Sequence, residues 1–358
     1  MSAVILQVGQ CGNQLGLEWC ELLCKTSKQV AHRSPFITKE DTLAVVCVDS
    51  ESKVLKRAHR LVKNKKLLES NVVQGKGGRG NNWAYGYHGP RGAEGDKLLH
   101  GAMEAVRREA EKRDYYGGTV MVHGVSGGTG SGLGSRLCEE IRAEYPVSHL
   151  LSVSVVPHQS GESPLQHYNT LLSLDALHSG LSLGMEPWEL IRSVCPMPSA
   201  KLLSITQASS REKQKWDRLA GLTLQSVPQL SPAGKSYTSR AVLAVARGDQ
   251  DKSFATSRAL YKLKRGHRCV AWNPFPIDHW TDPCNEMTGS SSGAAQLLTV
   301  CSNHSSVTSL LDHTLRRSKE KMDVRAYLHW YERYGVETQD FQQAMDTLLN
   351  VMEEYDAQ

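Results

Sequence analysis

The residues best suited to do chemistry in this chain are the glycines and hydroxyls of one short run, Ser126 to Gly134 (SGGTGSGLG). Glycine lets a backbone turn tightly and approach a ligand closely. Successive N–H groups in front of a helix attract anions, because they and the helix dipole present positive charge. The run therefore predicts a phosphate-binding loop. A flexible linker is the alternative, which the strand-like segment before the run and the helix-like segment after it disfavour.

The spacing of the loop excludes two common phosphate motifs. A Walker A loop ends in Gly-Lys-Ser/Thr, but Leu133 follows Gly132 here, so the loop has no lysine. A dinucleotide fingerprint needs G-x-G-x-x-G near the start of the fold, whereas these glycines alternate at positions 128, 130, 132 and 134. Binding would therefore depend on backbone donors, on the hydroxyls of Thr129 and Ser131, and on a metal ion.

Carboxylates and amides stand in other loops of the first half. Asp49 and Glu51 come directly after the apolar run 43–48 (LAVVCV), where carboxylates can hold Mg²⁺ directly or through water. Asn81 lies in the loop 80–84 (GNNWA), whose amides can bond phosphate or ribose. Each of these residues alone is more often a solvated turn residue. Their repetition after several strands is what favours a ligand site.

Strand-like segments in front of these loops would position them at one edge of a sheet. Four apolar runs suit buried parallel strands, at residues 3–8, 43–48, 119–123 and 149–156. The first runs into Gly9–Gln14 (GQCGNQ), a second glycine turn before a helix that continues to about Lys25. Ser163 and Pro164 suit the start of a helix after the fourth run. This alternation predicts an α/β fold, with a Rossmann-like, mostly parallel sheet.

The second half has the pattern of an α+β domain that ends in helices. Strand-like segments cover residues 240–247, 269–272 and 296–301, and apolar residues recur with helical spacing over 305–319 and 338–355. The apolar stripe of the last helix consists of Leu348, Val351, Met352 and Tyr355.

Composition and charge exclude some classes of protein. No run of about 18 apolar residues predicts a membrane-spanning helix, and the chain begins directly with a strand, which predicts no secretory leader. The 9 cysteines contain no C-x-x-C pair and favour reduced thiols in the cytosol. The net charge is +5. The basic run Lys53–Lys66 could bind nucleic acid or an acidic partner, but we favour a solvated helix face and expect no nucleic acid and no membrane as partner.

Three motifs in this order resemble the tubulin family: GQCGNQ at 9–14, GNNWA at 80–84 and GGTGSG at 127–132. The run Arg325–Tyr331 (RAYLHWY) is similar to the helix that tubulins place on their outer surface. The delta branch is the most similar, because NNWAYGY at 81–87 is followed by HGPR at 88–91, and because Gln166 stands where conventional tubulins have an acid.

The resemblance implies a tubulin/FtsZ-type GTPase domain, with GTP or GDP and Mg²⁺ as ligands. Asp49 and Glu51 would lie near Mg²⁺, the glycine loop would wrap the β- and γ-phosphates, and Glu162 would approach the ribose. The full set of nucleotide contacts that it implies is Gln10, Cys11, Gln14, Asn81, Ser126, Gly127, Gly128, Thr129, Gly130, Ser131, Gly132 and Glu162.

One segment departs from the family pattern. We expect residues 1–181 to form the nucleotide-binding domain and residues 240–358 to form an α+β domain with a C-terminal helical hairpin. Residues 182–239 would form a shortened connecting region. The family carries there a central helix, asparagines that read guanine, and an acidic loop that promotes hydrolysis in the next subunit. We assign none of these here, so catalytic residues stay unassigned and the chain is a GTPase at most.

The resemblance implies a GTP-binding cytoskeletal protein that assembles with alpha, beta or divergent tubulins at centriolar microtubules. Its expected locations are the cytoplasm, the cytoskeleton, the centriole or basal body, the cilium and also the nucleus. Two alternatives stay open. One is a nucleotide-free structural or regulatory variant of such a tubulin. The other is an oxidoreductase or methyltransferase with a dinucleotide or adenosyl cofactor, which the glycine spacing disfavours.

Overall fold

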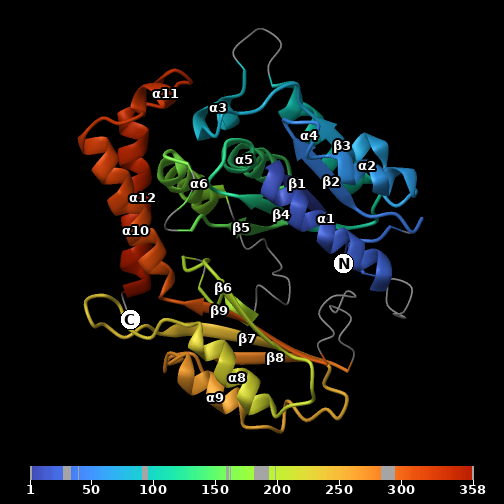
Figure 1. Ribbon diagram of the computed structural model, residues 1–358, viewed down its shortest axis with the longest axis vertical. Helices are drawn as coiled ribbons and strands as arrows, with labels where there is room; N and C mark the ends of the chain where they lie inside the picture. The colour runs from blue at the N-terminus through green and yellow to red at the C-terminus, as the bar shows by residue number, and fades with distance from the viewer. Residues whose placement is uncertain are drawn as a thin grey trace. The chain divides into compact units, whose positions relative to one another are not determined.

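The computed structural model describes residues 2–26, 34–38, 40–90, 96–158, 161, 163–180, 193–197, 199–283 and 295–356. The chain divides into two compact units (Figure 1). Unit 1 consists of residues 1–186 and 314–349, and unit 2 consists of residues 187–313 and 350–358. Among the described residues, none of the helices has the length and apolar character needed to cross a membrane.

Unit 1 contains a five-stranded parallel sheet in the order β3-β2-β1-β4-β5. This confirms the parallel α/β sheet that the sequence predicts. The strands are β1 (Ser2–Val8), β2 (Val45–Asp49), β3 (Val72–Gln74), β4 (Tyr116–Gly124) and β5 (His149–Val155).

Helices cover both faces of this sheet. They are α1 (Gly9–Thr26), α2 (Lys56–Lys63), α3 (Trp83–His88), α4 (Lys97–Glu111), α5 (Gly134–Glu144) and α6 (Gln166–Gly180). Side chains of a strand alternate between its two faces. Leu6 of β1 therefore packs in one core cluster with Leu98 of α4 and Leu137 of α5, while Ile5 packs in another with Leu17 of α1.

Unit 2 contains a mixed four-stranded sheet in the order β6-β9-β7-β8. The strands are β6 (Ser204–Ser210), β7 (Ser239–Arg247), β8 (Ile277–Asp282) and β9 (Gln296–His304). The helices α8 (Trp216–Gln225) and α9 (Ala259–Gly266) contribute Trp216, Leu219 and Leu263 to a core that includes Val242 and Leu298 of the sheet. The second sheet with its helices agrees with the α+β pattern of the second half.

Three helices end the chain: α10 (Val307–Asp323), α11 (Leu328–Glu332) and α12 (Thr338–Asp356). The division between the units falls inside α10 and α12. The middle part of this C-terminal segment thus belongs to unit 1, and β6 pairs along its whole length with β9 in unit 2. The two units therefore have other boundaries than the ranges 1–181, 182–239 and 240–358 expected from the sequence. The reason is that each unit contains segments that lie far apart in the sequence but pack together.

One strand forms at a different place from the predicted one. Cys269 makes only an isolated bridge with Ser239, and the predicted strand 269–272 is absent. Strand β8 forms at Ile277–Asp282 instead. Pro274 and Pro276 have no N–H to give to a sheet ladder, so the strand begins only after them.

Candidate functional site

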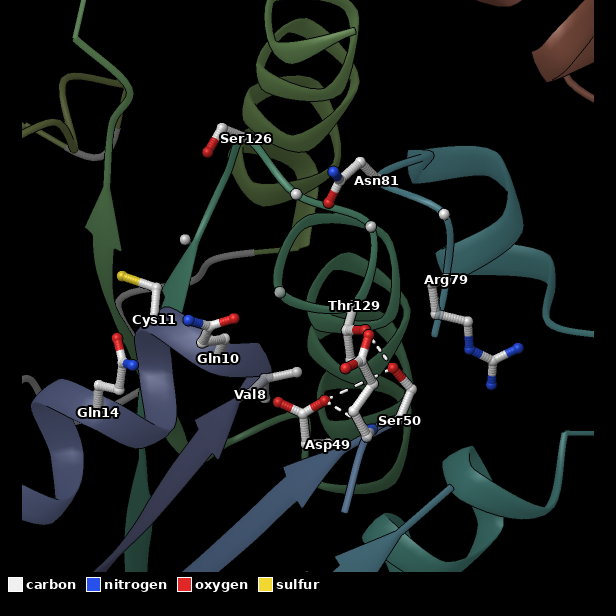
Figure 2. Close-up of a pocket in the computed structure, with 16 residues that line it drawn as sticks. Val8, Gln10, Cys11, Gln14, Asp49, Ser50, Arg79, Asn81, Ser126 and Thr129 are labelled. Atoms are coloured by element: carbon white, nitrogen blue, oxygen red, sulfur yellow. Dashed lines mark hydrogen bonds between the residues drawn. The ribbon is translucent and has the colours of Figure 1, made fainter. Parts of the chain in front are cut away.

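A cavity of about 520 Å³ lies at the carboxyl end of the parallel sheet (Figure 2). Val8, Val48 and His123 are paired in the strand register, so the segments after β1, β2 and β4 leave the sheet at the same edge. Ligands of open α/β sheets bind at this edge. The cavity is lined by Val8, Gln10, Cys11, Gln14, Asp49, Ser50, Glu51, Arg79, Gly80, Asn81, Gly124, Ser126, Gly127, Gly128, Thr129 and Gly130.

The turn between β1 and α1 brings three polar side chains to the cavity. Gly9 has a φ of +75°, which other residues rarely adopt, and helix α1 begins directly there. A Cβ at Gly9 would lie 2.7 Å from the backbone N of Gly130, so the two glycine turns touch. Gln10, Cys11 and Gln14 therefore line the cavity from the first turns of α1.

Asn13 ties the start of α1 to the end of β2. Its side chain is fully buried, and its Nδ2 donates to the carbonyl oxygens of Gly9 and Val48, both at 2.9 Å. Because both carbonyls are buried, these bonds satisfy groups that would otherwise be costly to leave unpaired. The bonds hold the β1 and β2 loops in a common position.

The glycine loop continues from β4 into a π-helical turn, Thr129–Leu133, and then into α5. A Cβ at Gly128 would lie 2.6 Å from the Arg79 carbonyl oxygen, and a Cβ at Gly132 would overlap the Trp83 carbonyl oxygen. At Gly127 the nearest atom would be 3.9 Å away. Most of these glycines are therefore required by backbone packing, while Gly127 borders open space in the cavity.

His123 holds the glycine loop through the carbonyl group of Gly130. Its Nδ1 lies 2.7 Å from the Gly130 carbonyl oxygen, which can only accept, so Nδ1 carries the proton and donates. Its Nε2 then accepts from one of the hydroxyls of Ser152 and Ser154, which lie 2.8 and 3.0 Å from it. These two hydroxyls are 2.7 Å apart, so the other one donates to its neighbour. Burial lowers the pKa of His123 to about 4. The ring is therefore neutral at pH 7 and orients one carbonyl of the loop.

Acidic and hydroxyl groups form one corner of the cavity. Asp49 Oδ1 accepts from the backbone N–H of Glu51 at 2.9 Å, and the hydroxyls of Ser50 and Thr129 are 2.7 Å apart (Figure 2). Burial, followed by the charge of Glu51, raises the pKa of Asp49 to about 6. Asp49 Oδ2 is buried and has no hydrogen-bond partner in the part of the chain that the structure describes. An oxygen of this kind fits a divalent cation.

A cation at this corner needs ligands in addition to the protein. Within the described ranges, no group of three or more histidine, cysteine, aspartate or glutamate side chains is suited to hold a metal ion. Mg²⁺ usually binds through one or two carboxylates together with substrate phosphates and water. Asp49 and Glu51 therefore suit a metal that arrives with a phosphate ligand.

The loop before α3 forms the opposite wall. Gly80 and Asn81 have φ values of +58° and +50°, and asparagine tolerates this region better than most residues. Arg79 points away from the Asp49 corner in Figure 2, and its Nη2 lies 2.9 Å from both carboxylate oxygens of Asp96. This buried ion pair anchors the loop beside the N-terminus of α4, whose N-cap is Asp96.

Asn169 of α6 joins this wall to the glycine loop. Its Nδ2 donates to the carbonyl oxygens of Asn81, at 2.7 Å, and Ser126, at 2.8 Å. The two loops are therefore held by one side chain that lies outside the cavity lining.

The structure brings most of the predicted site residues together. Those that line the cavity are Gln10, Cys11, Gln14, Asp49, Glu51, Asn81, Ser126, Gly127, Gly128, Thr129 and Gly130. Ser131 and Gly132 are buried outside the lining, and the Ser131 hydroxyl donates to the Gly127 carbonyl oxygen. Glu162, predicted to approach the ribose, lies outside the described residues.

Sequence reasoning missed other residues of the site. Ser50 and Arg79 line the cavity, and His123 and Asn169 hold its loops. A signal existed for His123, since it interrupts an apolar strand and a buried polar residue needs partners. Asn169 stands among other polar residues at the start of α6 (QHYNT), so no such signal distinguished it. No signal distinguished Arg79 from a solvated loop arginine.

Comparison with known proteins gives a family match and several relatives. The GTPase domain model of the Tubulin/FtsZ family matches residues 2–182. Tubulin delta chain from Homo sapiens is 33% identical over 234 residues, which cover 58% of this chain and 49% of the relative. Tubulin delta chain from Mus musculus is 32% identical over 238 residues, or 59% and 50%. Tubulin beta-1 chain from Chondrus crispus is 24% identical over 436 residues, or 99% and 93%.

The matched lengths differ between these relatives. The chain spans about half the length of the tubulin delta chains that it matches. The alignment with the beta-1 chain is 436 residues long and exceeds the 358 residues of this chain. That relative therefore contains segments without a counterpart here.

The neutral state of His123 predicts a pH dependence of stability. The pKa is 6.5 in an unfolded chain and about 4 in the folded one, so the unfolded state binds more protons between these values. The stabilisation is complete above pH 6.5 and is lost as the pH falls toward 4.

His123→Asn keeps a donor for Gly130 but does not titrate. We expect urea unfolding to show a smaller stability difference between wild type and His123→Asn at pH 5 than at pH 7.5; an unchanged difference would contradict this.

The packing around the glycines predicts a clear loss of stability on substitution at one position of the loop and almost no change at another. Gly132→Ala pushes a methyl group into the Trp83 carbonyl and should lower the free energy of unfolding by about 1–3 kcal/mol. Gly127→Ala meets no atom closer than 3.9 Å and should change it by less than about 0.5 kcal/mol. Thermal unfolding of the ligand-free variants measures both, and equal losses would show that the loop tolerates no side chain at either position.

Proposed function

The chain belongs to the Tubulin/FtsZ family, and from this premise we propose that the cavity at the edge of its five-stranded sheet binds a guanine nucleotide together with Mg²⁺. The family match covers residues 2–182, which include every residue that lines the cavity. The protein is a tubulin-like cytoskeletal protein, and its nucleotide would act, as in a tubulin-type GTPase domain, by ordering the loops around it.

The observation that carries the proposal is the convergence of an anion site and a cation site in one cavity. The N-terminal end of the Thr129–Leu133 turn and of α5 faces the cavity through Gly127–Gly130. Free N–H groups and the positive end of a helix favour phosphate there. Asp49 Oδ2, which has no hydrogen-bond partner among the described residues, favours a cation in the same cavity. A nucleotide with Mg²⁺ satisfies both requirements at once.

The remaining contacts follow from the walls of the cavity. Gln10, Cys11 and Gln14 would contact the nucleotide from α1, and Asn81 would reach the phosphates from the opposite loop. Asp49 and Glu51 would hold Mg²⁺, which supplies positive charge against the phosphate oxygens. Ser131 and Gly132 would act by shaping the loop, because both lie behind it.

Nucleotide binding is tested by titrating the purified chain with GTP and GDP in the presence of Mg²⁺. Gly127→Ala places a methyl group in the cavity while leaving backbone packing intact. We expect it to weaken binding at least about tenfold, or about 1.4 kcal/mol. Chelation of Mg²⁺ with EDTA should also weaken binding, because the Asp49 carboxylate then faces phosphate without a cation.

Gly77→Ala is the matched control for this titration. Gly77 is also a loop glycine, no atom lies within 4 Å of a Cβ there, and it is outside the cavity lining. The control should bind as the wild type does. ATP as a competitor measures base selectivity. If the wild type binds neither GTP nor GDP, the site proposal fails, and the nucleotide-free structural variant becomes the better account.

We further propose a role in microtubule organisation at centrioles, basal bodies and cilia, with other tubulins as partners. The support is the similarity to tubulin delta chains, at 33% identity over 58% of this chain. A fluorescent fusion of the full chain should co-localise with a centriolar marker, and the Gly127→Ala variant should do so less than the Gly77→Ala variant. A diffuse distribution of the wild type would contradict this role.

A further inference from the structure

Asn169 of α6 joins three other segments of unit 1: the loop before α3 with the start of that helix, the glycine loop, and α11. Its side chain is fully buried. Its Nδ2 donates to the carbonyl oxygens of Asn81 and Ser126, at 2.7 and 2.8 Å. Its Oδ1 accepts from the backbone N–H of Trp83 at 2.8 Å and from the hydroxyl of Tyr331 at 2.7 Å. These bonds use both donors and both lone pairs of the amide.

The chemistry of the partners allows only one orientation of this amide. The two carbonyl oxygens can only accept, so Nδ2 must face them. The backbone N–H of Trp83 can only donate, so Oδ1 must face it. The Tyr331 hydroxyl is therefore the donor in its bond with Asn169. Removing that hydroxyl takes away one of the two donors that hold Oδ1.

Tyr331 belongs to α11, and the segment 330–334 contacts the start of α3 in two further places. Asn82, which is the N-cap of α3, donates through Nδ2 to the Trp330 carbonyl oxygen at 3.0 Å. The rings of Tyr85 and Tyr334 are stacked, with centroids 4.5 Å apart and planes 13° apart. The loop 79–82 and α3 are thus held both by the glycine loop and by the C-terminal segment.

The backbone around α11 is strained and depends on these contacts. Arg325 and Tyr327, neither of them glycine, have φ values of +52° and +62°. Such conformations cost free energy and persist only where the surroundings impose them. Tyr327 precedes α11 without a side-chain capping bond. The five-residue helix α11 is therefore positioned by its contacts with Asn169 and α3 rather than by local preference.

We propose that Asn169 and Tyr331 are positioning residues that couple the nucleotide cavity to α11. This proposal rests on the proposed function of the cavity. A nucleotide that contacts Asn81 and the Ser126 loop fixes the two carbonyls that Asn169 holds, and so holds Asn169 in the position from which it accepts from Tyr331. Because coupling between two sites is reciprocal, docking of α11 strengthens nucleotide binding by the same factor.

The coupling gives the nucleotide site an effect at the protein surface. Trp330 and Tyr327 are 48% and 40% exposed, beside the buried Tyr331. How well these two side chains are ordered depends on how firmly α11 is held. Occupancy of the cavity thus changes the order of an exposed aromatic surface on unit 1 through one amide and one hydroxyl.

Tyr331→Phe tests the proposal, because it removes the donating hydroxyl and keeps the ring that packs against Phe341, with centroids 5.2 Å apart. Tyr168→Phe is the matched control. Tyr168 is equally buried and packs against Tyr331 at 5.5 Å, but its hydroxyl has no hydrogen-bond partner within the described residues. Loss of one hydrogen bond predicts about fivefold weaker GTP binding in Tyr331→Phe, and no weakening in Tyr168→Phe.

Hydrogen exchange of the nucleotide-free chain separates this proposal from the binding proposal. In Tyr331→Phe we expect amides of residues 80–84 and 127–129 to exchange about fivefold faster, together with residues 328–335. Amides of β4 should keep their rates, which shows that the fold is intact. If the wild type binds no nucleotide but this exchange pattern appears, the coupling stands and the nucleotide proposal fails.

Two results would overturn the coupling. One is faster exchange in Tyr331→Phe that is confined to residues 328–335, which would make the hydroxyl a local anchor of α11. The other is exchange that matches the Tyr168→Phe control everywhere. With nucleotide bound, residues 328–335 of the wild type should exchange more slowly than in the free chain, and this difference should shrink in Tyr331→Phe.

Discussion

The site depends on the direct approach of backbone to backbone at the carboxyl end of one parallel sheet. Gly9 packs against Gly130, Gly128 packs against Arg79 in the loop before α3, and Gly132 packs against Trp83 at the start of α3. A methyl group at any of these contacts would push two loops apart. This close packing leaves one continuous cavity among loops that start from different strands. It also explains why a glycine-rich run follows β4 even though only part of that run borders the cavity.

Buried polar side chains set the orientation of the loops that the glycines bring together. Asn13 holds the carbonyls at the start of α1 and near the end of β2, His123 holds a carbonyl of the glycine loop, and Asn169 holds the carbonyls of Asn81 and Ser126. Each of these side chains is buried, lies outside the cavity lining, and gives a backbone carbonyl of the loops a hydrogen-bond partner. A rigid scaffold of this kind can present free N–H groups to a phosphate without reorganisation on binding.

Sequence reasoning recovered the parallel α/β sheet and most of the cavity lining, for a local reason. Strand, turn and helix signals are short-range, and parallel strands bring their carboxyl ends to one edge. The strand predicted at 269–272 is wrong for a local reason, because Pro274 and Pro276 have no N–H for a sheet ladder and β8 begins only at Ile277. Distant segments decide other features, such as the pairing of β6 with β9 in unit 2. Such pairing is invisible in a single stretch of sequence.

Length, motif spacing and the lysine-free glycine run were enough to predict a nucleotide-type α/β domain with a phosphate-binding loop. Only the tertiary structure decided which loop residues border the cavity, since Gly127 lines it while Ser131 and Gly132 are buried behind it. Only the tertiary structure placed Tyr331 on Asn169, a contact between residues 162 positions apart. The physical reason is that spacing along the chain specifies local conformation, whereas hydrogen bonds between buried groups depend on packing that brings distant segments within about 3 Å.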